Sequence, residues 1–142
     1  FVLCGDGVAR EELEGMAACM PNIKFLPLQP ADRLNDLLNM ADVHLLPQRV
    51  DAEDLVMPSK LTSMLASGRP VIATAREGTQ VADVVKHCGA VVQPGDVAGL
   101  KSAILQLVDD RAGRKRLGEA GRRYATEHWS REKVLERVFT AR

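Results

Sequence analysis

Short apolar runs alternate along the chain with segments in which apolar residues recur at helical spacing. The runs are no longer than four residues, which suits strands, and the segments between them repeat apolar residues every three or four positions, which indicates helices. The expected strands are residues 1–4, 23–26, 43–46, 71–74 and 90–92, and the expected helices are residues 9–20, 31–40, 58–67, 79–86 and 96–108. This alternation predicts βαβ units, and hence an open parallel sheet of about five strands with helices on both faces.

The last third of the chain combines a helical pattern with an uneven charge. Helices are expected over about residues 111–127 and, with Ser130 as N-cap, from there to the end. Residues 111–142 contain 10 Lys and Arg against 4 Asp and Glu, whereas residues 1–110 contain 9 against 15. One interpretation is a helical tail with a solvated charged face. The other is a tail that lies near anionic lipid or near a second, acidic domain.

Size, charge and cysteine content limit the class of protein. With 142 residues and 46% hydrophobic side chains, the chain can form one domain with a proper core, and we expect a single domain over residues 1–142. A formal net charge of zero argues against a dedicated nucleic-acid surface. The three cysteines lack metal-type spacing, which favours a reducing, cytoplasmic compartment.

Two further absences concern targeting. No apolar run approaches the roughly 20 residues needed to cross a bilayer, and no signal-peptide pattern is present. The chain begins directly on an expected strand, without a start methionine. We therefore expect it to be a piece of a longer protein.

The stretch from Asp54 to Thr74 combines a helix start, a short helix and a buried strand. Pro58 and Ser59 suit the start of the helix, because proline fits a first helical position and serine can cap free amides. Gly68 is expected to end the helix. The first turn would present free amides beside Lys60, which is typical of an anion site. An ordinary surface lysine at this position is the alternative.

The loops that follow the strands are expected to meet in one crevice, because ligands on parallel sheets bind at the carboxyl ends of the strands. These loops are at residues 5–7, 27, 47–57 and 75–78. Within them we expect a diphosphate cradle made by the backbone amides near Val56, Met57, Ser59 and Lys60, with the ammonium group of Lys60 as an added positive charge.

Other nucleotide sites and active sites fit the sequence poorly. The run from Gly5 to Arg10 resembles a dinucleotide fingerprint but ends in Arg10 where Gly or Ala is required, and no GxxxxGK[ST] motif occurs. A phospho-receiver domain would need an acidic pair after the first strand, where only Asp6 stands. The three histidines are scattered and predict no metal site. No Ser-His-Asp order with a nucleophile elbow is present.

Several segments together resemble the carboxyl-terminal half of family 4 GT-B glycosyltransferases, and in particular bacterial exopolysaccharide enzymes of the colanic-acid type. The segments are FVLCGDG, ADVHLLP, PSKLTSMLASGRPVIAT, GTQVADVV, CGAVVQPGDVAGL and HWSREKVLERV, in this order over essentially the whole chain. The resemblance implies a Rossmann-like α/β/α donor-binding domain, an amino-terminal acceptor domain outside this chain, and retaining transfer from a nucleotide sugar without a metal or other cofactor.

The resemblance also assigns roles to residues. Gly5, Asp6 and Gly7 match the loop at the mouth of the donor crevice, and Leu26, Pro27 and Leu28 belong to the segment that lines the base, with Pro27 in place of the usual glycine. Pro58, Ser59 and Lys60 match a PSKL branch of the family.

The family's acidic pair is missing, because Leu55 and Ser63 stand at the positions of its two glutamates. Ser63 can still make one bond to the ribose hydroxyls. Asp51, Glu53 and Asp54 are the candidates to replace the first acid, and the sequence does not choose among them. The basic residues that usually grip the diphosphate would lie upstream of Phe1.

Three functional hypotheses follow from the sequence. The first is the donor half of a retaining glycosyltransferase, which takes a UDP- or GDP-sugar and a saccharide or lipid-linked acceptor in cell-surface polysaccharide synthesis, at the cytoplasmic face of the membrane. The second is a two-domain epimerase of nucleotide sugars. The third is a degenerate domain that binds a protein partner and no nucleotide, suggested by Leu55 and Ser63.

Overall fold

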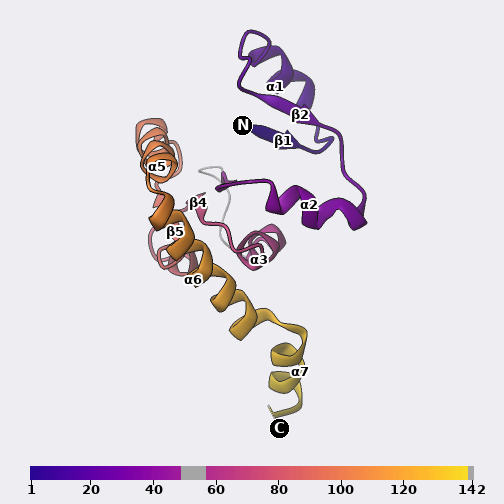
Figure 1. Ribbon diagram of the computed structural model, residues 1–142, viewed down its shortest axis with the longest axis vertical. Helices are drawn as coiled ribbons and strands as arrows, with labels where there is room; N and C mark the ends of the chain where they lie inside the picture. The colour runs from indigo at the N-terminus through magenta and orange to yellow at the C-terminus, as the bar shows by residue number, and fades with distance from the viewer. Residues whose placement is uncertain (49–56, 141–142) are drawn as a thin grey trace. The chain divides into compact units, whose positions relative to one another are not determined.

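The computed structural model describes residues 1–48 and 57–140 (Figure 1). Five strands alternate with helices in these ranges, and two further helices follow. The elements are β1 (Val2–Cys4), α1 (Arg10–Met16), β2 (Lys24–Leu26), the 3-10 turn η1 (Ala31–Arg33), α2 (Leu34–Asn39), β3 (His44–Leu46), α3 (Ser59–Ala66), β4 (Val71–Thr74), α4 (Gln80–Val85), β5 (Gly89–Val92), α5 (Val97–Asp109), α6 (Arg111–Trp129) and α7 (Arg131–Thr140).

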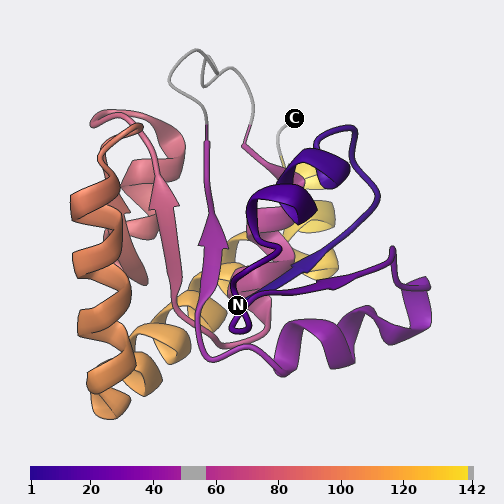
Figure 2. The ribbon, with the colours of Figure 1, turned by 90° about the horizontal axis from the view of Figure 1, so that it is seen from above.

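The chain divides into two compact units, residues 1–37 and 38–142. In the first unit, β1 and β2 pair in parallel, with Leu3 opposite Phe25. In the second, β3, β4 and β5 form a parallel sheet in that order, with Leu45 opposite Ile72. Figure 2 shows β3 and β4 side by side and pointing in the same direction. The five predicted strands and their parallel pairing are confirmed, but the described pairings form a two-stranded and a three-stranded sheet.

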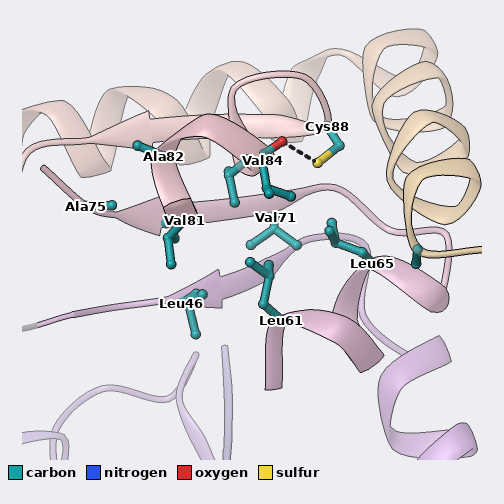
Figure 3. Close-up of a cluster of buried hydrophobic side chains, with 12 residues drawn as sticks. Leu46, Leu61, Leu65, Val71, Ala75, Val81, Ala82, Val84 and Cys88 are labelled. Atoms are coloured by element: carbon teal, nitrogen blue, oxygen red, sulfur yellow. Dashed lines mark hydrogen bonds between the residues drawn. The ribbon is translucent and has the colours of Figure 1, made fainter. Parts of the chain in front are cut away.

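Strand β4 is buried on both faces and divides the core of the second unit. Side chains alternate along a strand, so Val71 and Ala73 join one cluster, with residues of α3, α4 and α6 (Figure 3). Ile72 joins another cluster, with residues of α5. Helices therefore cover both faces of the sheet, as the sequence predicts.

The helix starts in the second unit are mostly fixed by side-chain caps. Asp96 Oδ1 accepts a hydrogen bond from the amide of Gly99 at 2.8 Å, and Asp110 Oδ1 accepts one from Gly113 at 2.7 Å. Thr79 caps α4 in the same way. The Ser130 hydroxyl accepts from the Lys133 amide at 3.4 Å, as expected for the start of α7. Each cap satisfies an amide that the helix itself cannot pair.

Two helices of the first 40 residues are shorter than predicted. α1 ends at Met16 instead of residue 20, and the segment predicted as one helix over 31–40 is the turn η1 followed by α2. Met16 and Met20 are 69% and 50% exposed, so the apolar face expected there is not buried. Spacing alone does not reveal this, since a periodic pattern is the same whether or not a partner surface covers it.

Helix α6 approaches the rest of the core through small residues, so the start of the basic tail is not merely a solvated helix. Gly113, Gly118, Gly121 and Ala125 are buried. A Cβ at Gly118 would overlap the carbonyl oxygen of Gly68, at the turn between α3 and β4. Only a residue without a side chain allows this contact between α6 and the turn.

We predict that Gly118→Ala lowers the free energy of unfolding by about 1–3 kcal/mol, because the added methyl group forces α6 away from the turn. This cost is expected to exceed the gain of about 1 kcal/mol in helix propensity. Urea denaturation measures the effect. Gly15→Ala in α1 is the control, because a Cβ there meets nothing within 4 Å. A Gly118→Ala protein as stable as the wild type would contradict the close contact.

Candidate functional site

The Gly5–Gly7 loop leaves the carboxyl end of β1 and leads into α1. Gly5 has φ +140°, which L side chains rarely adopt, so glycine is required at this turn. Its amide donates to the carbonyl oxygen of Leu26 at 3.1 Å, where β2 ends. Asp6 and Gly7 are exposed.

The base-lining segment predicted at Leu26–Leu28 lies beside this loop. The amide of Leu28 donates to Asp6 Oδ2 at 3.1 Å, and Cys4 Sγ donates to the carbonyl oxygen of Pro27 at 3.2 Å. Leu28 is 72% exposed. The structure thus brings together the two segments of the first unit that the sequence assigns to the donor site.

The predicted anion site begins at the amino terminus of α3. The helix starts at Ser59, and Pro58 is its N-cap residue, with φ −61° and ψ 124°. The expected serine cap is wrong, because no side chain caps this helix. The Leu61 amide donates to the Pro58 carbonyl oxygen at 2.9 Å, whereas helix geometry gives the Ser59 and Lys60 amides no acceptor within the helix.

Burial of the opposite face holds this helix in place. Leu61 and Leu65 are completely buried in the cluster around Val71, whereas Ser59 and Lys60 are exposed (Figure 3). The predicted apolar face is confirmed. The first turn therefore faces solvent on a helix fixed by its other side.

Ser63 is one turn further along α3. Its hydroxyl donates to the Lys60 carbonyl oxygen at 3.0 Å. The hydroxyl hydrogen is used within the helix, and the oxygen lone pairs can accept a bond from a ligand hydroxyl.

Some predicted residues lie outside the described residues. They are Val56 of the cradle, Leu55, and the three candidate acids Asp51, Glu53 and Asp54. Met57 and Pro58 are half-buried and lead into α3. The Gly5–Gly7 loop and the Leu26–Leu28 segment belong to the first unit, and the start of α3 with Ser63 belongs to the second. A single crevice formed by all of them stays a prediction.

Two polar residues near the predicted site were not foreseen as important. The Arg10 guanidinium donates through Nη1 to the carbonyl oxygens of Gly5 and Leu26, at 2.7 and 3.0 Å. Thr74, at the carboxyl end of β4, bonds to both backbone groups of Gln48 through its hydroxyl. The spacing of Asp6 and Arg10, four residues apart, was the signal available for an ion pair.

A buried histidine lies at the amino end of β3. His44 Nε2 is 3.0 Å from Ser67 Oγ, and the Ser67 hydroxyl donates to the Met64 carbonyl oxygen at 2.6 Å. Ser67 Oγ must therefore accept from His44 Nε2–H, which leaves the serine unactivated as a nucleophile. Burial and, to a lesser degree, the positive charge of Arg69 lower the pKa of His44.

Neither a metal cluster nor a membrane span is found in the part of the chain that the structure describes. No group of three or more His, Cys, Asp or Glu side chains there could hold a metal ion. None of the helices within residues 1–48 and 57–140 is long and apolar enough to cross a bilayer.

The family model described as "Glycosyl transferases group 1" matches residues 1–110. The chain belongs to this family.

Two named relatives show what this group 1 glycosyl transferase chain is similar to. The putative colanic acid biosynthesis glycosyl transferase WcaI of Escherichia coli is 37% identical over an alignment of 113 positions, which covers 76% of this chain and 28% of the relative.

The second relative is the GDP-mannose-dependent monoacylated alpha-(1-6)-phosphatidylinositol monomannoside mannosyltransferase of Corynebacterium glutamicum. It is 32% identical over an alignment of 145 positions, which covers 97% of this chain and 37% of the relative. This group 1 glycosyl transferase chain thus spans between about a quarter and two fifths of the length of these relatives.

The fold of the group 1 glycosyl transferase chain is confirmed by a solved structure, Anabaena HepE in complex with UDP. The TM-score is 0.79 at 16% identity, and the match covers 99% of this chain and 39% of HepE. At this identity the likeness concerns the fold, which is the Rossmann-like α/β arrangement expected from the sequence.

We predict that His44 makes stability depend on pH. Its pKa is lowered in the folded protein, so below the ordinary value of 6.5 the unfolded chain binds more protons than the folded one, and stability falls as the pH drops. Between about pH 7.5 and about pH 5.5, the wild type should therefore lose more of its free energy of unfolding than His44→Gln does.

Urea unfolding at both pH values measures this difference. His87→Gln is the control, because His87 is an exposed residue of the same unit. If His44→Gln and the wild type lose the same free energy on acidification, the interpretation of the buried histidine is wrong.

Proposed function

We propose that this chain forms the donor-binding part of a retaining glycosyltransferase. The enzyme moves a sugar from a UDP- or GDP-sugar to a saccharide or lipid-linked acceptor in cell-surface polysaccharide synthesis. The observation that carries the proposal is the exposed first turn of α3 in a chain of this family. At the amino terminus of α3, Ser59 and Lys60 offer backbone amides and an ammonium group, and Leu61 and Leu65 anchor the helix by their burial.

The chemistry of the reaction explains why such a turn would matter. When the glycosidic bond to the nucleotide breaks, negative charge grows on the diphosphate oxygens. Backbone amides and a lysine aimed at these oxygens stabilise the transition state more than the bound donor. Because they supply positive charge themselves, the proposal requires no metal ion or other cofactor.

The other contacts are assigned by position. Leu26, Pro27 and Leu28 line the base, and the Gly5–Gly7 loop lies at the mouth of the donor site. Ser63 accepts a hydrogen bond from a ribose hydroxyl, which its geometry permits because its own hydrogen is used within α3. Met57 and Pro58 lead into the first turn of α3, and Val56 is assigned to the diphosphate cradle from the sequence alone.

The relatives support the proposal in different ways. WcaI is named for colanic acid biosynthesis, the corynebacterial enzyme for a GDP-mannose donor and a phosphatidylinositol mannoside, and HepE was solved with UDP. These names favour a nucleotide-sugar donor and a cell-surface product. They leave open whether the donor is a UDP-sugar or a GDP-sugar. A lipid-linked acceptor would place the enzyme at the cytoplasmic face of the membrane, where the basic residues of α6 would face anionic lipid.

We predict that Lys60→Ala weakens the binding of UDP or GDP about tenfold, because it removes one charge-assisted contact to the diphosphate. Titration of this chain, followed by amide NMR, gives the dissociation constants and the residues that respond. Lys101→Ala removes the same positive charge from an exposed position on α5 and should leave binding unchanged. Equal affinities for Lys60→Ala and the wild type, or shifts confined to residues 111–140, would reject the role of α3. The absence of any nucleotide binding would favour a degenerate interaction domain.

We predict that Ser63→Ala abolishes a preference for ribose. The wild type should bind UDP a few-fold tighter than its 2′-deoxy analogue, because one hydrogen bond to the hydroxyl is lost in the analogue. Ser63→Ala should bind the two equally. Ser102→Ala, an exposed serine on α5, is the control. If Ser63→Ala keeps the full preference, another residue holds the ribose.

A further inference from the structure

The Asp6–Arg10 pair connects the Gly5–Gly7 loop to the end of β2. One nitrogen of Arg10, Nη1, donates to the carbonyl oxygens of Gly5 and Leu26 and to Asp6 Oδ1, at 2.7, 3.0 and 2.9 Å. The Arg10 side chain is only 27% exposed. Arg10 therefore ties the carboxyl ends of both strands of the first unit to one cation.

Asp6 extends this connection by one step. While its Oδ1 accepts from Arg10, its Oδ2 accepts from the amide of Leu28 at 3.1 Å. Pro27 has no N–H, so the Leu28 amide is the first donor after β2 by which the segment can be held. Both carboxylate oxygens thus accept from protein donors, and a carboxylate would in any case repel a diphosphate. Asp6 acts on its neighbours and not on the donor's phosphates.

An ordinary surface ion pair would not have these partners. Exposed pairs three or four residues apart usually bond only to each other and contribute little. Arg33 and Asp36, three residues apart, are such a pair, with side chains 66% and 70% exposed. Asp6 and Arg10 instead bond to backbone groups 22 and 16 residues away. Their main effect is on the geometry of residues 26–28.

We propose that Asp6 and Arg10 are positioning residues that hold Leu26–Leu28 in the conformation in which it contacts the base of the nucleotide. This inference rests on the proposed function, and it deepens the assignment of the base site. Leu28 is the residue that the pair presents, because its amide is fixed by Asp6 while the residue as a whole is 72% exposed. An apolar side chain on a fixed backbone can pack against the flat face of a base.

The pair should affect one end of the ligand and not the other. A nucleotide contacts residues 26–28 through its base, whereas pyrophosphate has no base. Loss of the Asp6 or Arg10 contacts should therefore weaken UDP and GDP and leave pyrophosphate unaffected. A general loss of folding would weaken all three ligands alike.

The test compares Asp6→Ala and Arg10→Gln with Glu14→Gln. Glu14 is the matched control, because within the described residues it accepts from Arg10 Nε at 2.8 Å and does not bond to residues 26–28. In Asp6→Ala, hydrogen exchange of the Leu28 amide should be at least about tenfold faster than in the wild type. The dissociation constant of UDP should rise about tenfold, whereas that of pyrophosphate should stay within about twofold of the wild-type value. Glu14→Gln should match the wild type in all three measurements. Asp6→Asn keeps one acceptor for the Leu28 amide, so its Leu28 exchange rate and its UDP dissociation constant should be close to those of the wild type.

The outcomes separate this inference from the proposed function. If the wild type binds UDP or GDP and the variants weaken nucleotide and pyrophosphate equally, or leave Leu28 exchange unchanged, only the positioning role is overturned. If the wild type binds neither nucleotide nor pyrophosphate, the proposed function fails and the positioning role fails with it. Should Asp6→Ala not fold, as judged by urea denaturation, the same ratios are measured on Arg10→Gln, which removes the contact to the Leu26 carbonyl oxygen.

Discussion

The burial of β4 on both faces is the constraint on which the second unit depends. A strand with no exposed face must be covered by helices on each side, and its parallel neighbours supply its backbone hydrogen bonds. Complete burial of a leucine contributes about 1.5–3 kcal/mol, so Leu61 and Leu65 fix α3 firmly against this strand. This packing also fixes the position of the exposed residues at the start of α3, which need no stabilising contacts of their own.

Much of the fold is readable from the chain because each apolar run is short and bounded by turn residues. The runs that contain Leu45 and Ile72 are short enough to indicate strands, and the Asp96 cap follows from its place before an apolar periodic segment. The helix ends near Met16 and Met20 were less predictable. They depend on whether a partner surface covers the apolar face, which periodicity does not record.

The candidate site was predictable to a smaller extent. The Gly5–Gly7 loop and Leu26–Leu28 follow from the rule that parallel strands bring their carboxyl ends together, and the structure places them side by side. The part played by Arg10 could not be read from spacing. Its decisive bonds join residues distant in sequence, and an arginine at the start of a helix has the same local pattern whether it binds solvent or two strand ends. The resemblance alone suggested Ser63.

The glycine-lined face of α6 has a consequence for where this domain ends. The family model stops at residue 110, yet α6 begins at Arg111 and contributes Ala125 to the same cluster as Leu65. A domain boundary placed at residue 110 would therefore remove one side of the hydrophobic core and expose apolar side chains to water. The minimal folding unit and the shared sequence signature are different lengths of chain, and the former includes the helix that the latter omits.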